Sequence, residues 1–152
     1  MITTKMKPKY KLLLTGIFIL LLLIGGFAWY LFTEKFADTA EKRSDYTVYA
    51  IDFIKEFQKN DSLANNKYVE KIISVKGIVT DLETLDSTVN IKMSDTLTGD
   101  YIIYTFQEQH LAEAKKIKMG EKVSIKGSCS GGTYSDILQT RYISFKRAVL
   151  IK

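Results

Sequence analysis

The sequence of 152 residues contains very little cysteine, histidine and proline, with one residue of each. A disulfide within the chain or a multi-cysteine zinc site needs at least two thiols, so the single Cys129 excludes both. The single His110 removes histidine-rich metal sites and leaves one candidate base for a Ser-His-Asp site. No convergent catalytic set accompanies it, so we expect a protein that is not an enzyme and that holds no metal or cofactor.

The net positive charge outside the N-terminus is small. The net charge is +5, from 22 Lys and Arg against 17 Asp and Glu. Residues 1–32 contain Lys5, Lys7, Lys9 and Lys11 and no acid, which leaves 18 basic and 17 acidic residues over 33–152. Single strands of nucleic acid are usually bound in a basic groove, so this balance disfavours a nucleic-acid partner.

One long apolar run is present, because the 21 residues Leu12–Phe32 contain no charge. As a helix they would span about 31 Å, close to the roughly 30 Å of a bilayer core. The lysines before the run predict a single-pass protein of the cell membrane with a cytoplasmic N-terminus and an extracytoplasmic (periplasmic) C-terminal domain. The alternative is a signal peptide cleaved after Gly26-Phe27-Ala28.

The remaining chain changes from helical to strand periodicity. Apolar residues at helical spacing predict an amphipathic helix; they are Tyr46, Tyr49, Ala50, Phe53, Ile54 and Phe57. We therefore expect five segments: a basic tail at 1–11, a transmembrane helix at 12–32, a stalk at 33–45, an amphipathic helix at 46–67 and a barrel at 68–152.

After Tyr68, alternating apolar residues predict five short strands. These strands are expected at 73–80, 88–93, 101–106, 123–129 and 137–145, with a polar loop at 83–87 and a helix at 107–117. Two similar segments, Ser74–Gly77 and Ser124–Gly127, each end in a glycine. In a small barrel such glycines are expected where strands one and four bend.

Five strands with a helix after the third form the element order of the OB-fold, a partly open Greek-key barrel. The same stretch contains, in order, Ala50, Phe53, Phe57, Asn65, Tyr68, Val75-Lys76-Gly77-Ile78-Val79, Phe106, Met119-Gly120-Glu121-Lys122-Val123 and Lys126-Gly127-Ser128-Cys129-Ser130-Gly131. With these residues the chain from Tyr46 to Lys152 resembles the bacterial tRNA-anti-like family of OB-fold domains, whose members usually follow a signal or membrane anchor.

The resemblance implies an all-β core with flanking helices. Its centre would be a five-stranded OB-fold Greek-key barrel (β-β-β-α-β-β), preceded by the amphipathic helix and the N-terminal transmembrane helix. The matching motifs are structural, so they imply a fold and no particular activity. Cys129 is expected to be a buried inert thiol in the fourth strand, and His110 a polar residue at a helix end.

OB barrels usually bind ligands across strands two and three, between two flanking loops. In this sequence that face is predicted to present Asn90, Lys92, Tyr101 and Ile103, with Tyr134 at a loop tip. We expect a membrane-anchored binding or interaction module whose partner is a small ligand or an envelope protein. The alternative is a domain that binds single-stranded nucleic acid in the manner of a tRNA anticodon-binding domain.

Overall fold

The computed structural model describes residues 8–33, 38–85 and 87–151, and the chain divides into two compact units at Ala37/Asp38. The first unit contains one helix of 26 residues, α1 (Pro8–Thr33), so residues 8–11 of the expected tail belong to this helix. Residues 1–7 of that tail and 34–37 of the expected stalk lie outside the described residues. Within the described ranges, no helix combines the length and the apolarity that crossing a membrane requires.

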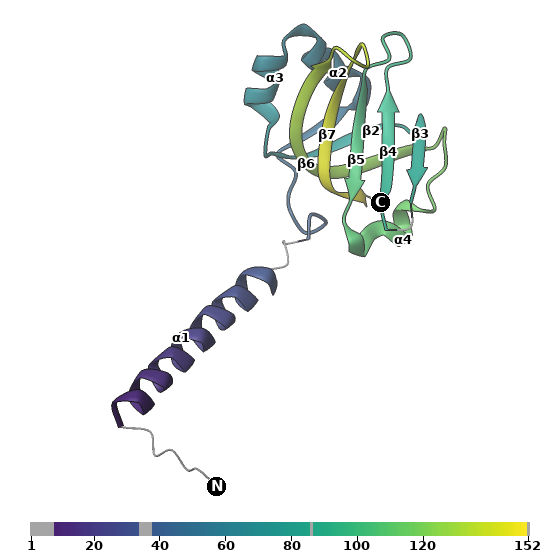
Figure 1. The fold of residues 1–152 in the computed structure, drawn as a ribbon. Coiled ribbons are helices and arrows are strands. Elements are labelled where there is room, and N and C mark those ends of the chain that lie inside the picture. The colour runs from purple at the N-terminus through teal and green to yellow at the C-terminus, as the bar shows by residue number, and fades with distance from the viewer. Residues whose placement is uncertain (1–7, 34–37, 86, 152) are drawn as a thin grey trace. The chain divides into compact units, whose positions relative to one another are not determined.

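The second unit is built on one seven-stranded sheet in the order β1-β2-β6-β7-β5-β4-β3 (Figure 1). The strands are β1 (Tyr46–Tyr49), β2 (Ile72–Ile78), β3 (Asp81–Thr84), β4 (Val89–Ser94), β5 (Tyr101–Phe106), β6 (Lys122–Ser135) and β7 (Thr140–Ile151). The helices are α2 (Ala50–Lys59), α3 (Asp61–Tyr68), a 3-10 turn at Glu108–His110 and α4 (Leu111–Ala114). Figure 1 shows α2 and α3 at one end of the curved sheet and α4 at the other.

Strands β2 and β3 are two halves of one long strand that changes partners. β2 runs antiparallel to β6, and β3 runs antiparallel to β4. Between them the Val79 N–H donates to the Glu121 carbonyl on the β6 side, and the Thr80 N–H donates to the Lys92 carbonyl on β4. If β2 and β3 together count as strand one, then β4, β5, β6 and β7 are strands two, three, four and five. Neighbouring strands then follow the OB-like order 1-2-3-5-4-1, in which strands three and five, β5 and β7, are parallel.

The expected five-stranded barrel is therefore corrected in two respects. The hydrogen-bonded sheet is open, with β1 and β3 at its edges, and it contains seven strands because strand one is split and β1 is added. β3 also occupies the start of the expected polar loop at 83–87. β6 extends past the expected 123–129 because its pairing with β7 continues to Ser135, and β7 begins at Thr140 and ends at Ile151, later at both ends than the expected 137–145.

The helix expected at 46–67 is wrong at its first turn. Tyr46–Tyr49 form β1, parallel to β2, and show the alternating burial of a strand. Tyr46 and Tyr49 are three residues apart and fit one face of a helix, whereas Tyr46 and Val48 fit the alternation of a strand. From Ala50 onward the prediction is confirmed, since Phe53, Ile54 and Phe57 of α2 are fully buried.

The two similar glycines have different roles. Gly127 lies at a register shift between Lys126 and Ser128, so it marks the expected irregularity in strand four. Gly77 sits in regular pairing with Val123. A Cβ on Gly77 would lie 2.6 Å from the Met93 sulfur and 2.8 Å from the Ala50 Cβ, so this glycine makes room for α2 rather than for a bend.

A cluster of buried rings joins α2 to the sheet. The Phe53 ring centroid lies 4.8 Å from that of Tyr68 and 5.8 Å from that of Phe145, and Tyr104 lies 5.1 Å from Phe145. Burying one such side chain contributes about 1.5–3 kcal/mol. This cluster holds α2 against the inner side of the sheet. The outer side of β4, β5 and β7 is not covered by the cluster.

Candidate ligand-binding face

The outer side of β4, β5 and β7 gathers polar and aromatic side chains that are half buried. The inward residues of β5 are Ile102, Tyr104 and Phe106, as the alternation predicts. The register sets Lys92 opposite Ile103, and the parallel pairing sets Tyr101 beside Tyr142. We name the set Asn90, Lys92, Tyr101, Ile103 and Tyr142 the ligand face.

Two tyrosine rings form the centre of the ligand face. The Tyr101 and Tyr142 rings are stacked, with centroids 6.1 Å apart and planes inclined by 24°. The Lys92 Nζ lies 5.7 Å from the centroid of the Tyr101 ring. Half-exposed aromatic rings of this kind provide a surface on which a flat ring of a ligand can stack.

The single lysine of the ligand face is already paired with two carboxylates. Its Nζ donates to Asp81 Oδ2 at 2.9 Å and to Glu83 Oε1 at 3.1 Å, both on β3. The hydrogen bond to Asp81, followed by the one to Glu83, raises the pKa of Lys92, and the same contact lowers the pKa of Asp81. One lysine beside two carboxylates leaves the local charge slightly negative, so this surface attracts the phosphate backbone of a nucleic acid only weakly.

Tyr134 is separated from the other predicted site residues. A register shift between Cys129 and Gly131 inserts an extra residue into β6. A bulge of this kind reverses the alternation beyond it. Tyr134 consequently pairs with Arg141, whose guanidinium carbon lies 5.7 Å from the Tyr134 ring, on the opposite side of the hairpin from Tyr142.

The structure thus brings four of the five predicted residues together: Asn90, Lys92, Tyr101 and Ile103. Sequence reasoning missed Tyr142, which supplies the second ring. The alternation Tyr142-Ile143-Ser144-Phe145 already indicates that Tyr142 points outward. Its position beside Tyr101 depends on the long-range pairing of β5 with β7.

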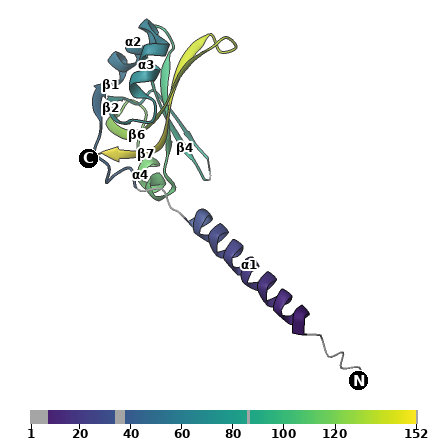
Figure 2. The same ribbon diagram turned by 90° about the vertical axis from the view of Figure 1, so that its left-hand side faces the viewer.

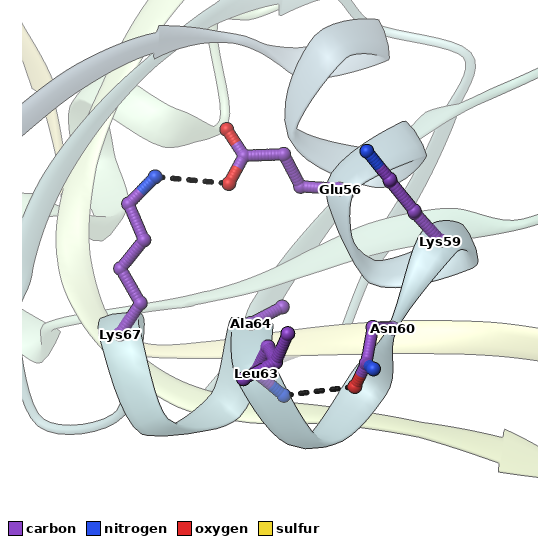
Figure 3. A pocket seen from close by; sticks show the side chains of 6 residues that line it. All are labelled: Glu56, Lys59, Asn60, Leu63, Ala64 and Lys67. Carbon is purple, nitrogen blue, oxygen red and sulfur yellow. Dashed lines mark hydrogen bonds and ion pairs between the residues drawn. The ribbon is translucent and has the colours of Figure 1, made fainter.

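A hollow of about 430 Å³ lies between α2 and α3 (Figure 3). Glu56 and Lys67 approach each other across it and form an ion pair at 3.0 Å. The Lys67 ammonium also lies 4.6 Å from the centroid of the Tyr68 ring. Hydrogen bonds to Tyr68 and then to Glu56 raise the pKa of Lys67. These contacts give Lys67 a role in holding α3 against α2.

Residues 38–42, which lead into the domain, are bound at the end of the domain opposite α2 and α3. His110 Nε2 lies 2.9 Å from Asp38 Oδ1, and the Thr39 N–H donates to Gln107 Oε1 at 3.2 Å. The Lys126 ammonium donates to the carbonyls of Ala40 and Lys42, both at 2.8 Å. His110 is thus a structural contact, and the second half of the expected stalk packs on the domain.

Cys129 is fully buried, and burial raises the pKa of its thiol to about 11, so it stays protonated at neutral pH. The prediction of a buried thiol is confirmed. Among the described residues, no three His, Cys, Asp or Glu side chains gather as ligands for a metal ion.

The sequence profile of the tRNA_anti-like family matches residues 6–142. A solved structure with a similar fold is a lipoprotein from Klebsiella pneumoniae, which is provisionally described as a nucleic acid-binding protein. The two sequences are 18% identical, and the TM-score is 0.55 over 69% of this chain and 91% of the lipoprotein. The aspartyl-tRNA synthetase of Entamoeba histolytica is 11% identical, with a TM-score of 0.41 over 57% of this chain and 19% of that one.

Comparison with curated protein sequences found no match. At 18% identity the Klebsiella structure bears on the fold alone. The expectation that disfavoured nucleic acid as a partner, which came from the net charge, gains no support from these comparisons.

Proposed function

The chain belongs to the tRNA_anti-like family, and from that premise we propose that it is a non-enzymatic binding module that stacks a flat ring of its ligand on the ligand face. The Tyr101–Tyr142 pair is the observation on which this proposal rests. Two rings aligned side by side on an outer surface contribute little to the core. They suit a ligand with a planar group, for which base-to-ring stacking contributes about 1–3 kcal/mol.

We propose further that residues 12–32 anchor the module in a membrane, with the N-terminus in the cytoplasm and the domain outside it. Support comes from the uncharged run Leu12–Phe32 and from the lysines that precede it. In α1, most of the described large apolar side chains, among them Phe18, Leu22 and Phe27, are more than half exposed within the chain.

Single-stranded nucleic acid is the second candidate ligand. The same two rings favour it, because bases are flat and extended strands stack them in succession on aromatic side chains. The ion pairs of Lys92 weaken the electrostatic part of such binding. If a nucleic acid is bound, stacking must therefore supply most of the affinity, and the dependence on salt will be shallow.

The test is a titration of the full chain, held in detergent micelles, with adenosine and with single-stranded RNA of about 15 nucleotides, close to the site size of one OB domain. We expect signals of the ligand face to shift in NMR spectra. Tyr142→Ala should weaken binding about tenfold, since it removes one stacking ring. Tyr134→Ala is the matched control and should change nothing, because that ring lies on the other side of the hairpin.

The two probes separate the candidates. If adenosine binds and RNA does not, even near 50 mM salt, the result supports the stacking module and contradicts nucleic acid as its ligand. Binding of neither probe at the ligand face, or equal losses from Tyr142→Ala and Tyr134→Ala, would contradict the proposal.

A further inference from the structure

Two turns at one end of the domain present large aliphatic side chains to solvent. Leu97, in the turn between β4 and β5, is 93% exposed; Ile137 and Leu138, in the turn between β6 and β7, are 94% and 59% exposed. Figure 2 shows the β6–β7 turn projecting from the body of the domain. We name Leu97, Ile137 and Leu138 the apolar tip.

Hydrogen bonds hold the two turns side by side. The Thr140 hydroxyl donates to the Gly99 carbonyl at 2.8 Å, and the Arg141 N–H donates to Asp100 Oδ1 at 2.7 Å. Gln58 of α2 also fixes the β4–β5 turn to the helix, because its amide donates to the Thr98 hydroxyl at 3.0 Å and to Asp100 Oδ2 at 2.9 Å.

Each turn is also fixed internally. The Leu97 N–H donates to Asp95 Oδ1 at 3.0 Å, and the Leu138 N–H donates to the Ser135 hydroxyl at 3.3 Å. The apolar side chains are therefore presented by backbone that is already ordered. Binding through such preorganised loops loses less conformational entropy than binding through loops that must first become ordered.

The charge around the apolar tip narrows the choice of partner. Residues 94–100 and 135–140 contain three acids, Asp95, Asp100 and Asp136, and no lysine or arginine. Arg141 forms ion pairs with Asp100 at 3.2 Å and with Asp61, so its positive charge is neutralised by these two carboxylates. Asp136 is exposed, whereas Asp95 and Asp100 are each 6% exposed; since neither turn contains a lysine or arginine, the two turns carry a net negative charge.

An acidic rim argues against two partners. Loops that insert into an anionic leaflet need lysine or arginine beside their apolar residues, and these turns have none. A second copy of the same tip would place like carboxylates opposite each other, which costs binding energy.

We infer that the apolar tip is a docking site for a different protein, one that offers an apolar pocket rimmed by lysine or arginine. The convex turns fit a concave partner, and the acidic rim complements a basic one. This site lies on the turns at the end of the sheet, whereas the ligand face lies on the outer surface of the strands, so the inference does not depend on the proposed function.

The experiment is photo-cross-linking of the full chain in the membranes of the cells that make it. A benzophenone amino acid replaces Ile137 or Leu97, with Leu63 as the control position because it is 67% exposed on α3. We expect Ile137 and Leu97 to capture the same partner polypeptide, and Leu63 not to capture it.

Charge reversal tests whether this capture follows the proposed chemistry. Asp136→Lys should reduce the adduct about tenfold, because it replaces an attractive charge at the rim by one that repels the lysine or arginine of the partner. Asp52→Lys, a charge reversal at an exposed position on α2, should leave the adduct unchanged, as should Tyr142→Ala on the ligand face. Matching circular dichroism spectra of the variants would show that both reversed chains fold.

Four results would overturn the inference: the same adduct from Leu63, an adduct of twice the chain's mass, capture of lipid alone, or an adduct insensitive to Asp136→Lys. Loss of the adduct in Tyr142→Ala would also overturn it, because the partner would then belong to the ligand face. Failure of adenosine and RNA to bind would contradict the proposed function while leaving this result intact.

Discussion

Single amide and carboxylate side chains determine how α2 and α3 are fixed to the sheet. The Asn65 amide donates to the Gly132 carbonyl at 2.9 Å, and its oxygen accepts from the Gly132 N–H at 2.9 Å. One side chain thus satisfies both backbone groups of a glycine in the middle of the β6–β7 hairpin. Asn65 is among the residues that match the family pattern, and this contact gives the match a physical reason.

Asn65→Asp should destabilise the domain by about 1–3 kcal/mol. The carboxylate keeps the acceptor for the Gly132 N–H but loses the donor, and it places a negative oxygen beside the Gly132 carbonyl. Urea unfolding of the micelle-held chain, followed by circular dichroism, measures the change. Asn66→Asp, at the exposed neighbouring position, is the control and should have almost no effect. Equal stability of the two variants would contradict this role for Asn65.

Asp100 links stability to pH. Burial raises the pKa of this carboxyl, but hydrogen bonds from the Arg141 N–H, Gln58 and Thr140, together with the Arg141 charge, outweigh burial and lower it overall. A carboxylate whose pKa is lower in the folded state stabilises the fold above its unfolded pKa of about 3.9. This stabilisation is lost as the pH falls through the folded-state pKa.

Unfolding free energies measured across the acidic range should therefore fall more steeply in the wild type than in Asp100→Asn. Near neutral pH the variant should be less stable by about 1.5–3 kcal/mol, because it loses charged hydrogen bonds. Asp136→Asn, at an exposed position, should follow the wild-type curve. Parallel curves for Asp100→Asn and the wild type would show that Asp100 does not determine the acid sensitivity.

At the scale of elements, local periodicity predicted the inward-facing residues well. The buried face of α2, the inward set of β5 and the burial of Cys129 were all readable from spacing, because side-chain direction repeats with a fixed period inside one element. β3 escaped prediction because its edge position leaves Glu83 and Thr84 exposed, so no apolar alternation marks it. Tyr46–Tyr49 fitted two periods at once.

Pairing between distant strands was not readable from the sequence. The extra residue in β6 near Ser130 moves Tyr134 to the other side of the hairpin, and no local pattern announces such a bulge. The parallel β5–β7 pairing joins Tyr101 to Tyr142 across 41 positions of sequence. Most of the candidate site was therefore predictable residue by residue, whereas its second ring and the exclusion of Tyr134 required the sheet.

At the scale of the whole molecule, charge and apolarity are divided between the two units. The excess of lysine precedes the apolar run, and the domain that follows is nearly neutral, so the net charge of +5 describes the tail more than the domain. This division supports the proposed orientation in a membrane and explains why the overall basicity is a poor guide to the ligand.

Cysteine labelling of the full chain tests that orientation. Cys129 is buried and its thiol has a pKa of about 11, so we expect the maleimide to label the folded wild-type chain very little. In spheroplasts, a membrane-impermeant maleimide should label Ser62→Cys, at an exposed position on α3, and should label Thr4→Cys only after permeabilisation.

The membrane fraction of the same cells, washed with carbonate, provides the control for anchoring. A retained apolar segment keeps the chain in the pellet, because burying about 20 apolar residues in the bilayer outweighs any loss of surface contacts at high pH. A cleaved segment would release the domain to the supernatant. Recovery there, or labelling of Thr4→Cys before Ser62→Cys, would contradict the proposed anchor, while the ligand face and the apolar tip would keep their separate tests.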